Sequence, residues 1–315
     1  MAEETLKNQS SGIIPAFTIL IVNRNSAGYL RACLRSLLET RGDLVVELVL
    51  VDGSSTDSSL AVVQELWPAA KVIVVPANLG YVRGNNVGLK HATGRYTMYL
   101  NSDTIVYPGA LEALLTYLET HPEVGAVSGT ILNPDGSDQG VVRRFPTFMN
   151  GLFGRRSFLS RLFPNNRWYR QYMKSRSTKG DEPYEAEILS ACSMVVPTLL
   201  LREAGGMDER FHFYWVDAEL CCRLTRRGKK IVCVPAARIL HHEGKGGSTS
   251  TFAKRLRMNL AFNHDAYLAY VEYHQFSRWD PRRLITKAIL TARTIAGIGL
   301  LLLRPHRATS SGGSN

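Results

Sequence analysis

The sequence predicts an α/β fold in which a mostly parallel sheet is covered by helices on both faces. Two observations support this prediction. Several short segments are β-type apolar runs without polar alternation, and such strands are typical of a parallel sheet buried on both faces. Each run is followed by a segment whose apolar residues recur at helical spacing, and this alternation is typical of nucleotide-binding α/β domains.

The elements follow one another in a regular order. The first strand covers Ala16–Val22, and a helix is expected over Tyr29–Glu39. The later elements are expected at Val45–Val51 (strand), about Asp57–Leu66 (helix), Lys71–Val75 (strand), near Asn85–Ala92 (helix) and Tyr96–Leu100 (strand). Asp57 is expected to be an N-cap, since its short carboxylate can accept from the first amides of a helix.

Short polar side chains follow four of these strands at the point where each strand ends. They are found in the segments Asn23–Asn25, Asp52–Asp57, Asn78–Gly80 and Asn101–Asp103. Turn formation would explain any one segment alone. Because ligands of parallel sheets bind beyond the carboxyl ends of the strands, the four segments together predict a ligand site at this edge.

The residues after the first strand exclude two common nucleotide-binding classes. A dinucleotide-binding dehydrogenase would carry G-x-G-x-x-G there, whereas residues 23–28 read N-R-N-S-A-G. The same segment also lacks the Gly-rich basic phosphate loop that nucleotidyl transfer would need, and the chain has no Walker loop.

Composition and charge limit the classes of protein to which this chain can belong. With 315 residues, 45% hydrophobic and 21% charged, the chain is neither disordered nor fibrous nor a multi-span membrane protein. The net charge of +11 is unevenly distributed. Residues 140–180 hold ten basic and no acidic side chains, and residues 251–315 hold ten basic and three acidic ones. An anionic partner is expected to meet these two regions.

Cysteine usage and the apolar runs predict a cytoplasmic protein. The five cysteines form no C-x-x-C pair, which is typical of a reducing compartment. The polar N-terminal segment MAEETLKNQSSG lacks the apolar core of a signal peptide. The longest late apolar run, Ile295–Leu303, has nine residues, whereas a membrane span needs about 20. We therefore expect no membrane span.

Three motifs together resemble those of glycosyltransferase family 2. They read V-D-G-S-S-T-D, N-L-G-Y-V-R-G-N-N-V-G and Y-L-N-S-D-T, and the similarity continues through Gly205–Glu209, Phe213–Leu220 and His241-His242. The resemblance covers residues 16 to about 250 and is closest to bacterial rhamnosyltransferase-like members that build cell-envelope polysaccharides. It implies the GT-A fold and a nucleotide-sugar donor.

The resemblance assigns the donor pocket to the strand ends. The residues that it places in the nucleotide pocket are Asn23, Asp52, Asn78, Gly80, Asn85, Asn101 and Ser102. A carboxylate such as that of Asp52 can accept from the N3–H of uracil or thymine, which cytosine lacks. The resemblance alone favours dTDP-L-rhamnose as the donor, with a UDP-hexose as the next choice.

A divalent cation is also implied. Asn101-Ser102-Asp103 stands where the family carries its D-x-D motif, so Asp103 is expected to hold Mg²⁺ or Mn²⁺ against the donor diphosphate. The resemblance places a histidine near the same ion. The choice between His241 and His242 stays open, and either ring could instead be a structural hydrogen-bonding group.

Asp217 is the expected general base. Inverting sugar transfer needs a carboxylate that removes the proton of the acceptor hydroxyl. The family motif Glu-Asp-x-Asp reads Val216-Asp217-Ala218-Glu219 here, which keeps the aspartate that aligns with the base. The same residue is expected to N-cap a helix over residues 218–227.

The two basic regions are expected to face a membrane or to pack on protein. Region 140–180 interleaves its basic residues with aromatics, but no nucleic-acid recognition motif accompanies them. An anionic membrane surface that guides a lipid-linked acceptor is favoured over a packed insertion. The region from Thr251 suits an interfacial amphipathic helix, or a helix that packs on its own domain or on a second copy in a homo-oligomer.

These predictions divide the chain into four parts. Residues 1–15 are a polar tail, 16–105 the nucleotide-sugar half, 106–250 the acceptor half with the basic insertion 140–180, and 251–315 a basic helical region with a disordered tail. The expected function is inverting transfer of a sugar to a hydroxyl of a lipid-linked cell-envelope saccharide by an enzyme peripheral on the inner membrane face. The alternative is a catalytically silent homologue that acts as a membrane assembly partner.

Overall fold

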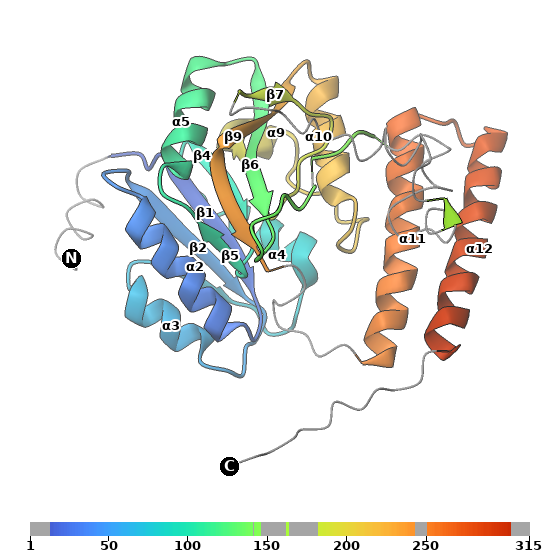
Figure 1. Ribbon diagram of the computed structural model, residues 1–315, viewed down its shortest axis with the longest axis horizontal. Helices are drawn as coiled ribbons and strands as arrows, with labels where there is room; N and C mark the ends of the chain where they lie inside the picture. Colours follow the sequence, from blue (N-terminus) through green and yellow to red (C-terminus); the bar gives the residue numbers. More distant parts are fainter. Residues whose placement is uncertain (1–12, 141, 146–161, 164–181, 243–250, 304–315) are drawn as a thin grey trace, which may run out of the picture.

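The computed structural model describes residues 13–140, 142–145, 162–163, 182–242 and 251–303. Within these ranges nine strands form one sheet in the order β3-β2-β1-β4-β8-β6-β9-β5, and β7 pairs with β9 beside this path. Figure 1 shows the sheet and its helices as one body and the last two helices beside it. Most of the basic insertion 140–180, both tails and the stretch after His242 lie outside the described residues.

The strands are β1 (Phe17–Asn23), β2 (Val46–Asp52), β3 (Lys71–Val74), β4 (Tyr96–Leu100), β5 (Thr104–Val106), β6 (Val124–Leu132), β7 (Tyr184–Glu185), β8 (Ser193–Pro197) and β9 (Lys230–His241). The helices are α2 (Ala27–Thr40), α3 (Ser59–Leu66), α4 (Gly80–Leu89), α5 (Ala110–Thr120), α9 (Thr198–Glu203), α10 (Val216–Arg226), α11 (Phe252–His274) and α12 (Pro281–Leu303).

The first half of the sheet confirms the predicted alternation of strands and helices. Strands β3, β2, β1 and β4 are neighbours and all pair in parallel. The register of β1 on β2 runs from Phe17↔Val46 to Asn23↔Asp52, so both strands end side by side. The prediction of burial on both faces fails for β3, because Val72 and Val74 of this edge strand are 39% and 56% exposed.

The second half is mixed, so the description as mostly parallel applies to the first half alone. Strand β8 is antiparallel to β4 and to β6, while β6 and β9 are parallel. Ser193 pairs with Leu100, and His241 at the end of β9 pairs with Thr104. The start of β8 and the end of β9 therefore lie at the edge where β4 ends.

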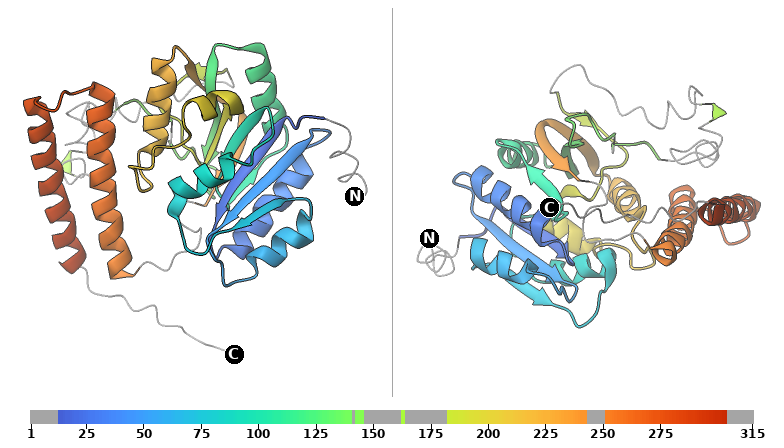
Figure 2. Two further views of the ribbon diagram at one scale, coloured as in Figure 1. Left: turned by 180° about the vertical axis from the view of Figure 1, so that it is seen from behind. Right: turned by 60° about the horizontal axis from the view of Figure 1, so that its bottom comes forward.

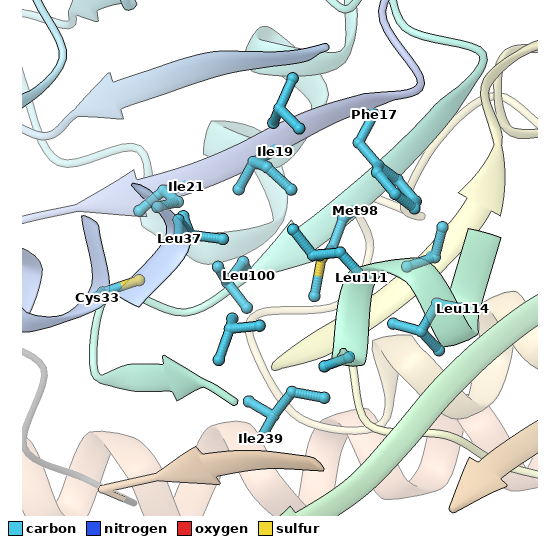
Figure 3. Packing of buried hydrophobic residues seen from close by; sticks show 14 of the residues in the cluster. Phe17, Ile19, Ile21, Cys33, Leu37, Met98, Leu100, Leu111, Leu114 and Ile239 are labelled. Atoms are coloured by element: carbon cyan, nitrogen blue, oxygen red, sulfur yellow. The ribbon is translucent and has the colours of Figure 1, made fainter. Parts of the chain in front are cut away.

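Helices cover both faces of the sheet, as the apolar pattern predicts. One cluster of buried side chains joins the sheet to α2, α3 and α5, and Figure 3 shows part of it around Ile19, Leu37 and Met98. A second cluster joins the other face to α4, α9, α10 and α11. Helix α4 packs closely on β1 because Gly84 and Gly88, one turn apart, face Val22 and Leu20 without a Cβ between them.

Two helix starts differ from the prediction. Helix α4 begins at Gly80, five residues before the expected Asn85. Helix α3 begins at Ser59, and Asp57 Oδ1 accepts from the Ser59 amide at 3.0 Å. Asp57 Oδ2 also accepts from the amide of Ala27, the first residue of α2, at 2.9 Å. The expected capping carboxylate thus serves two helices rather than one.

The C-terminal region is a helical hairpin. Figures 1 and 2 show α11 and α12 side by side, with α12 on the outer side, away from the sheet. We expected no membrane span because the longest late apolar run has only nine residues. That argument was wrong, because α12 is long and apolar enough to span a membrane by length and composition. The 22 residues Pro281–Leu302 contain an 18-residue window with a mean hydropathy of 1.5, and only 11% of that window is buried. The helix continues through isolated polar residues, which a count of uninterrupted apolar residues misses.

Candidate active site

The ends of β1 and β2 form a buried polar network. Asn23 Nδ2 donates to Asp52 Oδ2 at 2.9 Å, and Ser26 donates its hydroxyl to Asn23 Oδ1. The same hydroxyl lies 3.0 Å from Ser102 Oγ, beyond the end of β4. Because these side chains come from three neighbouring strand ends, the structure brings together Asn23, Asp52 and Ser102 as the sequence predicts.

Asp52 shapes the loop that follows β2. Its Oδ1 accepts from the Ser55 amide at 2.7 Å and its Oδ2 from the Ser55 hydroxyl at 2.6 Å, and the side chain has no exposed area. These bonds fix residues 53–55 against β1, where the Gly53 amide donates to the Asn23 carbonyl. A direct contact of Asp52 with a nucleobase stays a prediction.

The third polar segment lies next to this loop. Asn78 Oδ1 accepts from the amide of Gly80 at 3.0 Å and would lie 3.4 Å from a Cβ placed on Gly53. Gly80 starts α4 with a φ of +78°, a conformation that glycine adopts without strain. Asn85, one turn later, is buried and donates to the Tyr81 carbonyl within α4. The structure thus uses Asn85 first as a helix contact.

Asp103 and His241 form the acid–imidazole pair that a cation would need. His241 Nε2 lies 3.4 Å from Asp103 Oδ1 and 3.3 Å from Asn101 Nδ2, and both Asp103 and His241 are less than a tenth exposed. Two ligands of one ion, each about 2.1 Å from it, stand at such a separation. Asp103 directly precedes β5 and His241 ends β9, and the pairing of these two strands holds the residues in place.

Gln139 orients the imidazole toward Asp103. Its side-chain amide donates to Asn133 Oδ1 at 3.1 Å and to the His241 carbonyl at 3.2 Å, so its Oε1 faces His241 Nδ1 at 2.9 Å as an acceptor. Gln139 thus accepts from Nδ1 of His241 and leaves Nε2 facing Asp103. A second partner of this kind is typical of metal-binding histidines.

His242 and Asn101 complete this side of the site. His242 packs its ring on Tyr29, with 5.3 Å between centroids, while its amide donates to the Asp103 carbonyl. The structure thus places His241, rather than His242, beside the Asp103 carboxylate. Asn101 contacts His241 through its side chain and Cys192 through its amide.

Asp217 lies in the first turn of α10, on the opposite side of the site. The prediction that it caps this helix is wrong, because α10 begins at Val216 and the residue before it is Trp215, whose φ is 63°. Burial raises the pKa of Asp217, and the nearby guanidinium of Arg143 works against this rise. A carboxylate with a raised pKa is a stronger proton acceptor when ionised.

Asp103 and Asp217 face a common neighbour. Burial raises the pKa of the Cys192 thiol to about 12, and the carboxylates of Asp217 and Asp103 add to that rise. Cys192 precedes β8, and the carbonyl of Ala191 next to it accepts from the Tyr81 hydroxyl at 2.8 Å. The carboxylates of the residues expected to hold the cation and to act as base thus both lie within electrostatic range of Cys192, just before β8.

Glu219 turns away from this centre, although it stands in the same motif as Asp217. Its carboxylate bonds to Arg223 Nε and Nη2 at 2.7 and 2.6 Å. Arg223 in turn donates to the Gly206 carbonyl at 2.9 Å. Glu219 therefore ties α10 to the preceding turn.

The sequence did not predict that Gln139 belongs to the site or that Arg143 acts on the carboxylate of Asp217. Gln139 follows a turn and belongs to no motif, and Arg143 was counted only as part of a basic region. Neither residue left a signal in the sequence: Gln139 directly follows the bridge Leu132↔Asp138 and Arg143 pairs with Ile188, and both bridges appear only in the fold.

A mixed sheet of this topology, with polar side chains at the strand ends of one half and a carboxylate–imidazole pair at the same edge, has the GT-A fold. The family model described as Glycosyl transferase family 2 matches residues 18–180, and the chain belongs to that family.

Known relatives agree with this assignment. An N-acetylglucosaminyl-diphospho-decaprenol L-rhamnosyltransferase of Mycobacterium tuberculosis is 30% identical over 274 residues, which cover 83% of this chain and 86% of that protein. The mannosyltransferase PcManGT from Pyrobaculum calidifontis, solved with GDP-Man and Mn²⁺, matches with a TM-score of 0.55 and 18% identity over 96% of this chain and 77% of that one. GalNAc-T7, solved with UDP, GalNAc and Mn²⁺, matches with a TM-score of 0.55 and 17% identity over 78% of this chain and 48% of that one. The two structures show a likeness of fold.

Proposed function

We propose that this family 2 protein is an inverting, metal-dependent glycosyltransferase that moves a sugar from a nucleoside diphosphate to a hydroxyl of a lipid-linked saccharide. The observation that supports the proposal is the buried Asp103–His241 pair at the strand ends, together with the carboxylates of Asp103 and Asp217 that both act electrostatically on Cys192.

The base in this proposal is Asp217. As the acceptor oxygen bonds to the anomeric carbon, the bond from that carbon to the diphosphate oxygen breaks, and the hydroxyl proton passes to the Asp217 carboxylate. Burial favours this proton transfer because it destabilises the charged carboxylate. Arg143 opposes this effect and favours the ionised carboxylate, which is the form that can accept the proton.

Asp103 and His241 are proposed to hold Mg²⁺ or Mn²⁺. Their oxygen and nitrogen donors, 3.4 Å apart and oriented by Gln139, suit such an ion. When bound, the cation supplies charge neutralisation for the departing diphosphate. The network of Asn23, Asp52 and Ser102 shapes the neighbouring nucleotide pocket.

The proposed donor is dTDP-L-rhamnose, with a UDP-hexose as the second candidate. The mycobacterial relative is named as a rhamnosyltransferase that acts on N-acetylglucosaminyl-diphospho-decaprenol, and its similarity covers most of both chains. We extend the donor sugar and the lipid-linked acceptor class from that protein to this one.

The proposed location is the inner face of the cell membrane. Helix α12 exposes large apolar side chains along its length, with Leu284, Ile295 and Leu302 73%, 65% and 68% exposed. Arg282 and Lys287 on the same helix supply the positive charge that anionic headgroups attract. A lipid-linked acceptor would be presented at that surface.

Calorimetric titration with dTDP and with UDP, each with and without Mn²⁺, tests the proposal. We expect one nucleotide to bind in a metal-dependent way. Asp103→Asn should weaken that binding, whereas Asp217→Asn should bind normally and lose turnover by about 10²–10⁴-fold. If folded protein binds neither nucleotide, the silent assembly partner is the better interpretation.

A further inference from the structure

Asp265 of α11 makes an unusual set of contacts with the loop that leads into α10. Its carboxylate has no exposed area. Oδ2 accepts from the successive amides of His212, Phe213 and Tyr214 at 3.0, 3.1 and 3.1 Å. Oδ1 accepts from the ring Nδ1 of His212 at 2.8 Å and of His264 at 3.1 Å. One carboxylate thus fixes three consecutive backbone amides.

The loop needs such an anchor because of its backbone. Trp215 directly follows the three amides and has a φ of 63°, which is uncommon for a bulky residue and is kept only where surrounding contacts enforce it. Asp217 stands two residues further on. The position of the proposed base therefore depends on the conformation that Asp265 imposes on residues 212–215.

The same loop presents an aromatic ring to solvent. Phe213 is 50% exposed and packs edge-on against Tyr81, with 5.4 Å between ring centroids. The Tyr81 hydroxyl donates to the Ala191 carbonyl, beside Cys192 at the centre of the site. An exposed aromatic ring four residues before the proposed base offers an apolar surface for the C–H groups of a sugar ring.

Metal binding is the other use that the cluster of His212, His264 and Asp265 suggests, because its ligand atoms lie within 4.8 Å of one another. The hydrogen bonds argue against it. Three amides occupy Oδ2, and both imidazoles already approach Oδ1 as donors. A carboxylate that orders a loop accounts for every one of these contacts.

We propose that Asp265 is the positioning residue of the acceptor site: it holds the loop 212–215 so that Phe213 contacts the acceptor saccharide and Asp217 reaches its hydroxyl. This inference rests on the proposed function. It assigns acceptor binding to the loop 212–215, which Asp265 of the C-terminal hairpin anchors. Helix α11 thereby becomes part of the site.

The test combines kinetics with hydrogen exchange. The variants are Asp265→Ala, Asp265→Asn, Phe213→Ala and, as a control, Asn263→Ala, whose buried amide bonds only within α11, to Asn259. Turnover is measured with dTDP-rhamnose and N-acetylglucosaminyl-diphospho-decaprenol, and donor affinity by calorimetry with dTDP and Mn²⁺. Exchange is followed in the peptide that spans residues 210–217.

Asp265→Ala should lower kcat/KM for the acceptor by about 10²-fold, since a misplacement of about 1 Å costs that much. Donor affinity should stay within about twofold, and exchange should accelerate at residues 212–214. Asp265→Asn should recover part of the loss because its carbonyl oxygen can still accept from the three amides. Phe213→Ala should raise the acceptor KM with little change in kcat, and Asn263→Ala should change neither.

Other results would overturn the inference. If donor affinity falls in parallel with turnover, or if both Asp265 variants unfold, the residue supports stability alone. Unchanged exchange at residues 212–214 would show that Asp265 does not order the loop. Absence of wild-type turnover with these substrates would refute the proposed donor and acceptor, while the exchange experiment would still decide whether Asp265 holds the loop.

Discussion

Replacing Glu219 by alanine should destabilise the protein strongly, although Glu219 stands two residues from the proposed base. Glu219 is 8% exposed, and its carboxylate holds both Nε and Nη2 of Arg223, whose side chain is 24% exposed. Removing one partner of a buried ion pair costs about 3–5 kcal/mol, because the other charge stays buried without compensation. For a domain of this size, that loss corresponds to a fall in Tm on the order of 10 °C.

The chain contains a matched control for this prediction. Arg31 and Glu65 also form a pair with two bonds, of 2.6 and 2.7 Å, but Glu65 is 54% exposed. Because an exposed pair contributes about 0–1 kcal/mol, Glu65→Ala should change Tm by only a few degrees. Thermal unfolding followed by circular dichroism measures both variants under the same conditions.

Turnover separates the two carboxylates of the motif. Glu219→Gln, assayed well below its Tm, should retain most of the wild-type turnover because its partner Arg223 lies away from the reacting groups. Asp217→Asn should retain its fold and lose turnover. A Glu219→Gln protein with the wild-type Tm and no turnover would refute this assignment, since it would place Glu219 in the chemistry.

Three further predictions follow from other contacts. Arg143→Ala should shift the acidic limb of the kcat/KM–pH profile to higher pH. Burial raises the pKa of the proposed base Asp217, and Arg143 opposes this rise. Without Arg143, Asp217 should therefore stay protonated and inactive up to a higher pH. An unshifted limb would separate Arg143 from the base. Gly94→Ala should lower the free energy of unfolding by about 3 kcal/mol, which urea unfolding measures. The new Cβ would lie 2.5 Å from the backbone nitrogen of Thr18 in β1, which cannot move aside. All five cysteines are buried and free, and burial raises the pKa of Cys33 and Cys192 to about 12. A thiol reagent at pH 8 should therefore label them only after denaturation. Rapid labelling of the folded protein would contradict the described core.

The fold of the nucleotide half follows directly from the sequence, and the reason is local. Strands β1 and β2 are largely apolar runs, and the polar residue that ends each of them directly follows the last apolar one. Asn23 and Asp52 could therefore be placed at one edge of the sheet before their contact was known. The strand Tyr96–Leu100 was predicted with the bounds that the structure gives it.

The acceptor side resists such prediction because its contacts join distant segments. Gln139 orients His241 from across the sheet, and Asp265 reaches a loop more than fifty residues earlier in the chain. Neither residue belongs to a periodic pattern. The start of α10 was misplaced for a related reason: the backbone of Trp215 is set by tertiary contacts with α11, not by a capping residue next to it in sequence.

The pairing of β5 with β9 determines the order in which the parts of the site form during synthesis and folding. Asn101 and His241 are 140 positions apart, so the histidine side of the cation pair exists only once the last strand has entered the sheet. Such long-range pairing is slow because the loop must close before the contact forms. During synthesis, the strand ends of β1 and β2 emerge from the ribosome long before β9 does. A nascent chain therefore carries the strand ends of β1 and β2 before His241 reaches Asp103, and the proposed cation site is complete only when the sheet is finished.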